Sequence, residues 1–187
     1  DCDEAAILFG WGYFEPWTDL ETITEQNHYL CKEILFTQNN SEADIALIRL
    51  DREVSSRQPL KYRKSGTLPN DRTVWMAGHP GTLPLKITEN GKITHNQEMN
   101  HFVTQLDTFA GNSGGPVFDS ETGQIEGVLI EGELTEMTIH GEWPGGCWYE
   151  KVFCAPENME KIRCDSNLEG YTGAKSTRIS VLWKYLP

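Results

Sequence analysis

Long apolar runs, Cys-x-x-Cys pairs and basic residues are scarce or missing in this sequence of 187 residues. No apolar run approaches the roughly 20 residues that a transmembrane helix needs, so we expect no membrane span. Without a Cys-x-x-Cys pair, the sequence lacks the usual spacing of a structural zinc site. Basic residues number 16 against 28 acidic ones, which gives a formal net charge of -12. Because that charge repels phosphate backbones and anionic lipids, we expect neither a nucleic-acid partner nor a membrane surface as a partner.

The first residues, Asp-Cys-Asp-Glu, are neither a signal peptide nor an ordinary translation start, so we expect further sequence upstream. Disulfides favour an oxidising compartment, and we expect a secreted or periplasmic protein. Because the number of cysteines is odd, one of them either bonds to a cysteine outside this sequence or remains a free thiol. The five cysteines are Cys2, Cys31, Cys147, Cys154 and Cys164.

The spacing of the cysteines suggests how they pair. Cys2 and Cys31 flank one apolar segment and are able to bond to each other, and two of the three late cysteines can form a local bridge around the loop after Trp148. The competing interpretation is a zinc site that adds His140 to the late cysteines, but these spacings match no usual zinc pattern. We therefore expect disulfides, no metal and no cofactor.

Short strand-like runs between turn residues dominate the chain, which predicts an all-β barrel or sandwich. Residues 51–72 are polar, rich in basic residues and broken by two prolines, which is typical of a linker. Residues 157–163 are a candidate helical turn. We expect single strands in 5–14, 28–36, 43–51, 73–78 and 102–107. Two hairpins are expected, one in 86–94 with its turn at Asn90-Gly91 and one in 116–132 with its turn around 120–123. Residues 176–186 are expected to form a last strand that runs into a C-terminal helix.

The most informative stretch is 109–118, Phe-Ala-Gly-Asn-Ser-Gly-Gly-Pro-Val-Phe. Glycines around a serine remove side chains where a backbone must approach something closely, and a substrate carbonyl is such a group. A nucleophilic serine needs an exposed hydroxyl on a tight turn and backbone N–H groups aimed at the oxyanion that forms on attack. Ser113 is the candidate nucleophile, and the N–H groups of Gly111 and Ser113 are the candidate oxyanion donors.

This stretch resembles the nucleophile loop of chymotrypsin-fold serine peptidases, especially the bacterial branch related to glutamyl endopeptidases. A second motif, Asp-Ile-Ala-Leu-Ile-Arg-Leu at 44–50, is similar to the segment in which these peptidases carry the aspartate that orients the catalytic histidine. The resemblance assigns that role to Asp44. It implies a double β-barrel with a short C-terminal helix and a Ser-His-Asp mechanism.

The histidine of that mechanism is not evident in the sequence. In the family it precedes the aspartate, and only His28 does so here, without the family's context around it. His79, His95, His101 and His140 follow Asp44 and are most simply surface or turn residues. We expect a separate N-terminal segment, such as a light chain or a propeptide-derived piece, to supply the histidine. The alternative is a catalytically inactive, peptidase-like binding module.

The resemblance also indicates substrate-binding residues. Asp107 lies six residues before Ser113, where trypsin-like relatives carry the aspartate that favours lysine or arginine, although relatives of the glutamyl endopeptidases carry Asp-Thr there without that preference. Thr108 belongs to the same pocket. Ile130, Glu131 and Gly132 match the segment that pairs with the substrate backbone as an added strand. Among the possible substrate specificities, we therefore expect cleavage after Lys or Arg.

These observations together predict a secreted serine endopeptidase that acts on peptides or proteins. Residues 1–65 would form the remainder of an N-terminal β-barrel, incomplete in this chain, plus a linker, and residues 66–187 a C-terminal barrel that carries the nucleophile. An acyl hydrolase acting on esters is a further alternative.

Overall fold

A computed structural model describes residues 2–12, 25–40, 43–132, 136–140, 147–151 and 173–186, with backbone only for 136–140 and 147–151. The elements are η1 (Cys2–Glu4), β1 (Ala6–Leu8), η3 (Glu25–Asn27), β2 (His28–Asn39), β3 (Asp44–Leu50), β4 (Thr73–Gly78), η4 (Pro80–Thr82), β5 (Lys86–His95), β6 (His101–Thr104), β7 (Pro116–Asp119), β8 (Ile125–Glu131), β9 (Glu136–His140), β10 (Cys147–Lys151), β11 (Ala174–Arg178) and η6 (Ile179–Leu182). Strands and short 3-10 turns therefore account for the regular structure of these residues, which confirms the all-β prediction.

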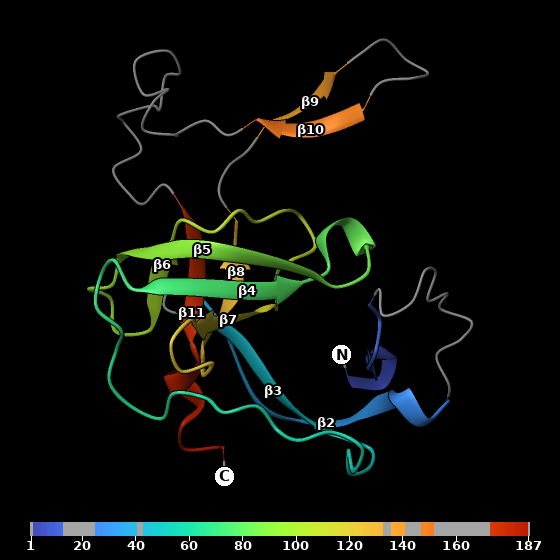
Figure 1. The fold of residues 1–187 in the computed structure, drawn as a ribbon. Coiled ribbons are helices and arrows are strands. Elements are labelled where there is room, and N and C mark those ends of the chain that lie inside the picture. The colour runs from blue at the N-terminus through green and yellow to red at the C-terminus, as the bar shows by residue number, and fades with distance from the viewer. Residues whose placement is uncertain are drawn as a thin grey trace, which may run out of the picture.

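A closed barrel forms the centre of the molecule (Figure 1). Its strand order is β11-β6-β5-β4-β7-β8, and every neighbouring pair is antiparallel. Along β4 half-buried and buried residues alternate, so Val74 and Met76 point into the barrel. The inward-facing side chains are Leu68, Val74, Met76, Ile93, Phe102, Leu106, Val117, Leu129 and Ala174. Closure leaves no unpaired strand edge in this part of the fold, apart from the ends of the longer strands.

The hairpin predicted at Asn90-Gly91 is wrong, because residues 86–95 form one continuous strand, β5. Asn90 has a φ of 64°, and two residues of β5 face Trp75 where the register with β4 shifts. A left-handed residue suits a β-bulge as well as a hairpin turn. A Cβ on Gly91 would lie 2.4 Å from Cγ of Leu106, so the glycine lets this side chain pack against the strand. The Asn-Gly pair bends one strand and does not join two.

The first part of the chain forms a separate three-stranded sheet in the order β1-β2-β3. In Figure 1 the long strands β2 and β3 lie below the barrel. A disulfide joins Cys2 to Cys31 and fastens the start of the chain to β2, which confirms that predicted pairing. The sheet is not closed by any described strand, and apolar side chains such as Leu30 and Ile34 on β2 are exposed.

The sheet and the barrel are in direct contact. The backbone N–H of Asp44, at the start of β3, donates to Oγ1 of Thr177 on β11 at 3.1 Å. The rings of Phe36 and Tyr185 lie 4.6 Å apart, centroid to centroid. The sheet thus meets the barrel on the side of β11, near the C-terminal turn.

The predicted linker, residues 51–72, runs along the barrel. Tyr62 forms a parallel bridge with Ile125, the first residue of β8. The three-stranded sheet ends at Leu50 and the barrel begins at Thr73. Where the boundary between 1–65 and 66–187 falls within this segment stays a prediction.

At the C-terminus the predicted strand and helix correspond to β11 and to η6, a single 3-10 turn followed by a turn at 183–185. The predicted helical turn at 157–163 lies outside the described residues. So do the pairings of Cys147, Cys154 and Cys164.

A buried ion pair fixes the hairpin between β7 and β8. Asp119 is fully buried and accepts hydrogen bonds from Nε and Nη2 of Arg72, at 2.6 and 3.0 Å, and from Oγ1 of Thr122 at 2.7 Å. Burial alone would raise the pKa of Asp119, but these bonds, a backbone N–H from Glu121 and the charge of Arg72 together lower the pKa to about 2. The carboxylate therefore stabilises the fold in its ionised form.

We expect the contribution of Asp119 to the free energy of unfolding to be present above its unfolded pKa of about 3.9 and lost as the pH falls toward about 2. Urea unfolding of wild type should show a loss of about 2 kcal/mol in that window. Asp119→Asn should unfold about 1–3 kcal/mol more easily at pH 7 and show a flatter dependence between these pH values.

The matched control is Glu121→Gln. Glu121 pairs with the same Arg72, but its side chain is 73% exposed, so its removal should cost less than about 1 kcal/mol. Equal losses in the two variants would contradict the assignment to the buried carboxylate.

Candidate active site

Ser113 and Asp44 line the same cavity, which has a volume of about 340 Å³. It lies where three segments meet: the start of β3, the loop of residues 105–115 between β6 and β7, and the second half of β8. We call this loop the Ser113 loop. The remaining lining residues are Ile45, Ala46, Gly114, Val128, Leu129 and Ile130. Two motifs 69 positions apart in sequence, at 44 and 113, are thus brought together by the packing of the sheet on the barrel.

Some backbone N–H groups of the Ser113 loop donate hydrogen bonds and others do not. Those of Asn112, Gly114 and Gly115 donate to backbone carbonyls at 2.8 to 3.0 Å. Within the described part of the chain, the N–H groups of Gly111 and Ser113 donate no hydrogen bond. Two neighbouring free donors beside an exposed serine are what an oxyanion on a tetrahedral intermediate requires.

Gly111 is required at its position for two reasons. Its φ is +95°, a left-handed value that side chains disfavour. A Cβ there would also lie 2.9 Å from the carbonyl oxygen of His79 and from the N of Gly81. The Gly81 N–H in turn donates to the carbonyl of Ala110 at 2.8 Å. The loop therefore rests directly on the turn at η4.

On its other side the Ser113 loop is fastened to β8. Gly114 donates to the carbonyl of Leu129 at 2.8 Å, and Leu129 donates back to the carbonyl of Gly115 at 2.9 Å. A Cβ on Gly115 would lie 2.7 Å from the carbonyl oxygen of Ala77 on β4. Support from η4, β4 and β8 fixes the position of the backbone that carries Ser113.

Asp44 reaches the cavity from β3. Its neighbours Ala43 and Ile45 are buried at 1% and 6% exposure, whereas the Asp44 side chain is exposed. The alternation places the carboxylate on the side away from the core. It is accessible to a histidine approaching from solvent or from another segment.

None of the described histidines lines this cavity. Nδ1 of His79 lies 3.0 Å from the carbonyl of Leu83, within the η4 turn. Nδ1 of His101 is buried without a hydrogen bond, and burial lowers the pKa of this imidazole. His28 lies at the start of β2 and His95 at the end of β5. That none of these residues is the base stays a prediction, and the structure brings none of them to Ser113.

The candidate specificity residues, Asp107 and Thr108, lie in the N-terminal part of the Ser113 loop. Thr108 is buried and its hydroxyl has no hydrogen-bond partner. A Cβ on Gly132 would lie 2.8 Å from this hydroxyl, so the residue that follows β8 lies close to the loop. Asp107 is exposed, whereas a pocket-floor role for a carboxylate presumes burial.

The end of β8 has an edge that no described strand pairs with on the β7 side. Val128 is the last residue of β8 that pairs with β7, yet the strand continues to Glu131, which pairs with Lys175 of β11 on the opposite side. No described strand pairs with Ile130 to Gly132 on the β7 side, and Ile130 lines the cavity. An extended peptide could add there as a strand.

Sequence reasoning missed the support that 79–81 gives to the Ser113 loop. His79 was predicted only to be a surface or turn residue, although a Gly after an apolar strand and a proline is also the signal of a close backbone approach. Asn112 was not assigned a structural role either. It is 4% exposed and packs so closely that a Cβ on Gly78 would lie 2.4 Å from its Oδ1.

The described residues hold no group of three or more His, Cys, Asp or Glu side chains placed to bind a metal ion. Among them, no helix is both long and apolar enough to cross a membrane.

A family model, the trypsin-like peptidase domain, matches residues 19–128, more than half of the chain. Among solved structures, the chain is similar to the active form of the Rv3671c protease from M. tuberculosis, with 19% identity and a TM-score of 0.43 over 55% of this chain and 49% of that one. It is also similar to the inactive form of a serine-to-alanine mutant of Rv3671c, with 16% identity and a TM-score of 0.44 over 59% and 57%. The chain thus spans about half the length of these structures. No curated protein matches the sequence.

The close approach at Gly111 generates a stability prediction. Gly111→Ala should lower the free energy of unfolding by about 2–5 kcal/mol, because left-handed strain adds to the clash with the carbonyl of His79. Gly114→Ala is the matched control: its φ is +88°, but a Cβ there would meet nothing within 4 Å, so only the strain of about 1–2 kcal/mol remains. Urea unfolding of both variants measures the difference. Equal losses would mean that the contact with η4 does not constrain the loop.

Proposed function

Because the chain belongs to the family of trypsin-like peptidase domains, we propose that it forms the nucleophile-bearing part of a secreted or periplasmic serine endopeptidase. Ser113 is the nucleophile, Asp44 orients the histidine base, and the N–H groups of Gly111 and Ser113 form the oxyanion hole. One observation carries the proposal. Ser113 is exposed, lies beside two N–H groups that donate no hydrogen bond among the described residues, and lines the same cavity as Asp44 of the second motif.

The proposed reaction follows from these positions. The Ser113 hydroxyl gives its proton to the base while Oγ bonds to the carbonyl carbon of the scissile peptide. The negative charge that develops on the carbonyl oxygen is held by the two N–H groups of the loop. The C–N bond then breaks, and the amine leaves with the proton from the base. Water next gives a proton to the base and attacks the acyl carbon, and the bond to Oγ of Ser113 breaks as Oγ takes that proton back.

The base in this proposal is a histidine from a segment N-terminal to the sequence, either a light chain or a propeptide-derived piece that stays docked. Two observations support it: none of the described histidines lines the Ser113 cavity, and the three-stranded sheet leaves apolar side chains of β2 exposed. That the described lining of the cavity includes no histidine also favours the second candidate, an inactive binding module with the same fold.

The proposed substrate is a peptide or protein that binds along the end of β8, from Ile130 to Gly132, with the residue before the cleaved bond beside Thr108. A preference for Lys or Arg rests on Asp107. Because this carboxylate is exposed, its attraction for a basic side chain is screened by solvent, and we expect a modest preference rather than an absolute one.

The mechanism is tested on the complete protein with a fluorophosphonate probe and a peptide hydrolysis assay. We expect the probe to label Ser113, and Ser113→Ala to lower kcat/KM by about 10⁴-fold or more. Asp44→Asn should lower it by about 10⁴-fold, because the histidine loses its orienting partner.

Ser120→Ala is the control, since Ser120 is also exposed but lies on the β7-β8 turn. Hydrolysis that survives Ser113→Ala would refute the proposed nucleophile. A protein that binds peptides but neither hydrolyses them nor reacts with the probe would be the inactive binding module.

The role of Asp107 is tested by comparing peptides that differ only in the residue before the cleaved bond. Asp107→Asn should lower kcat/KM for arginyl and lysyl peptides by about tenfold or less, as expected for one exposed charge, and leave leucyl peptides unchanged. Glu89→Gln, an exposed charge on β5, is the control. A uniform change across all peptides would show that Asp107 does not set specificity.

A further inference from the structure

Residues 54–70, which we call the basic strap, carry a charge opposite to that of the whole protein. The strap holds Arg57, Lys61, Arg63 and Lys64 and no acidic residue, a local charge of +4 in a chain of net charge -12. The fold shows that the strap is a fixed part of the barrel surface.

Backbone and side-chain bonds attach the strap to the start of β8. Ile125 donates to the carbonyl of Lys61 at 2.9 Å and accepts from the N–H of Arg63 at 2.9 Å. Nε of Arg63 also pairs at 2.5 Å with Glu126, which is 5% exposed. Because Arg63 neutralises a buried carboxylate, it anchors the strap, and its neighbours provide the exposed charge.

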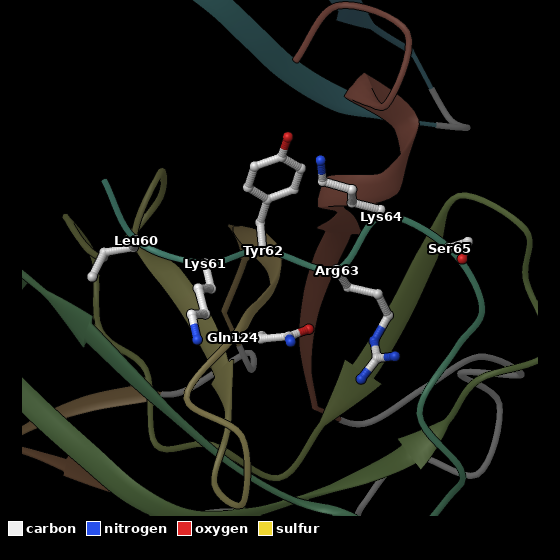
Figure 2. A pocket seen from close by; sticks show the side chains of 7 residues that line it. All are labelled: Leu60, Lys61, Tyr62, Arg63, Lys64, Ser65 and Gln124. Carbon is white, nitrogen blue, oxygen red and sulfur yellow. The ribbon is translucent and has the colours of Figure 1, made fainter. Parts of the chain in front are cut away.

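A cavity of about 510 Å³ lies along the basic half of the strap, lined by residues 60–65 and Gln124. Figure 2 shows Lys61 and Arg63 pointing to the side of the strap where Gln124 lies, and Tyr62 and Lys64 pointing to the other side. The Lys61 side chain is exposed and extends beside Gln124, so this side offers a cation together with a neutral hydrogen-bonding group.

A second cavity, of about 560 Å³, follows the other half of the strap and meets the first at Leu60. Phe9, Val54 and Ile125 give it an apolar lining. At its rim the Arg57 guanidinium lies 5.3 Å from the centroid of the Phe9 ring. Leu60, which lines both cavities, is 60% exposed. We call the two adjoining cavities the groove, with an apolar half (the second cavity) and a basic half (the first).

We propose that this groove is an exosite that binds an acidic peptide segment, with an apolar side chain of the segment in the half lined by Phe9 and Val54 and its carboxylates beside Lys61. Charge complementarity selects the acidic class. The size of the patch selects a short segment: at physiological salt the attraction extends only about 8 Å, and a long polyanion would meet the negative surface beyond it.

The groove is connected to the Ser113 cavity through β8. Ile125 contributes to the apolar half of the groove, and Leu129 and Ile130 line the active-site cavity. Four strand residues span about 13 Å, so one extended protein substrate is long enough to occupy both places. This link to catalysis rests on the proposed function, whereas binding in the groove does not.

The test uses the complete protein with Ser113→Ala, so that binding is measured without cleavage. The probe is a fluorescein-labelled peptide with one phenylalanine followed by a run of glutamates, and the readout is fluorescence anisotropy. We expect Lys61→Gln to weaken binding about 3- to 5-fold and Arg57→Gln with Lys61→Gln about 10-fold or more. Replacing the phenylalanine of the probe by glycine should also weaken binding.

Lys92→Gln is the matched control, an exposed lysine on β5 away from the groove, and it should leave binding unchanged. Arg63 is left intact because its removal would strand Glu126. The proposal is overturned if the glutamine version of the peptide binds equally well, or if Lys92→Gln weakens binding as much as Lys61→Gln. It is also overturned if a short oligothymidylate binds more tightly through the same residues.

A second readout separates this proposal from the proposed function. In the active protein, a substrate extended by the acidic segment should show a KM several-fold lower than the same substrate with glutamines, with kcat unchanged, and Lys61→Gln should remove the difference. Peptide binding without any hydrolysis would sustain the exosite and refute the peptidase. Hydrolysis with the same KM for the acidic substrate and its glutamine version would support the peptidase and refute the exosite.

Discussion

The Ser113 loop keeps its shape because the backbone is held from two sides at once. On one side Gly111 lies against the η4 turn so closely that no Cβ fits, and on the other Gly114 and Gly115 exchange hydrogen bonds with Leu129 of β8. Leu129 accepts the N–H of Gly114, and carbonyls of the loop itself accept those of Asn112 and Gly115, which leaves the N–H groups of Gly111 and Ser113 without a partner among the described residues. An oxyanion hole needs its donors fixed before the reaction, since donors that must reorganise stabilise a developing charge poorly.

The barrel supplies this rigidity, and the sheet supplies the second half of the site. The η4 turn follows β4, the Ser113 loop joins β6 to β7, and β8 lies beside β7, so closure of the barrel determines all three positions. Asp44 comes from outside the barrel, and its backbone is tied to Thr177 of β11. The site is therefore assembled at the contact between two sheets.

Much of the fold was predictable from sequence, and so was the choice of Ser113 and Asp44 as candidates that prove to line one cavity, because these signals are local; their catalytic roles stay a prediction. The Gly-Asn-Ser-Gly-Gly-Pro stretch and the Asp-Ile-Ala-Leu-Ile stretch carry chemistry in consecutive residues, and Cys2 and Cys31 flank a single segment. The errors and omissions came from contacts between distant residues. Asn90-Gly91 became a bulge because Leu106 packs against Gly91, and the linker at 51–72 became part of the barrel surface because Ile125 pairs with it. The exposure of Asp107 also depends on tertiary packing, which a motif offset does not encode.

The proposed catalysis requires Ser113, the two loop N–H groups and Asp44 to act on one reacting carbonyl with a histidine from another segment. A structure of the complete protein after reaction with a peptidyl phosphonate would test this most directly. The account predicts phosphorus bonded to Oγ of Ser113, a phosphonyl oxygen about 2.7–3.1 Å from the N atoms of Gly111 and Ser113, and an imidazole between Oγ and Asp44. An adduct whose oxygen lies away from these N–H groups, or a protein that forms no adduct while its loop keeps the same conformation, would contradict it.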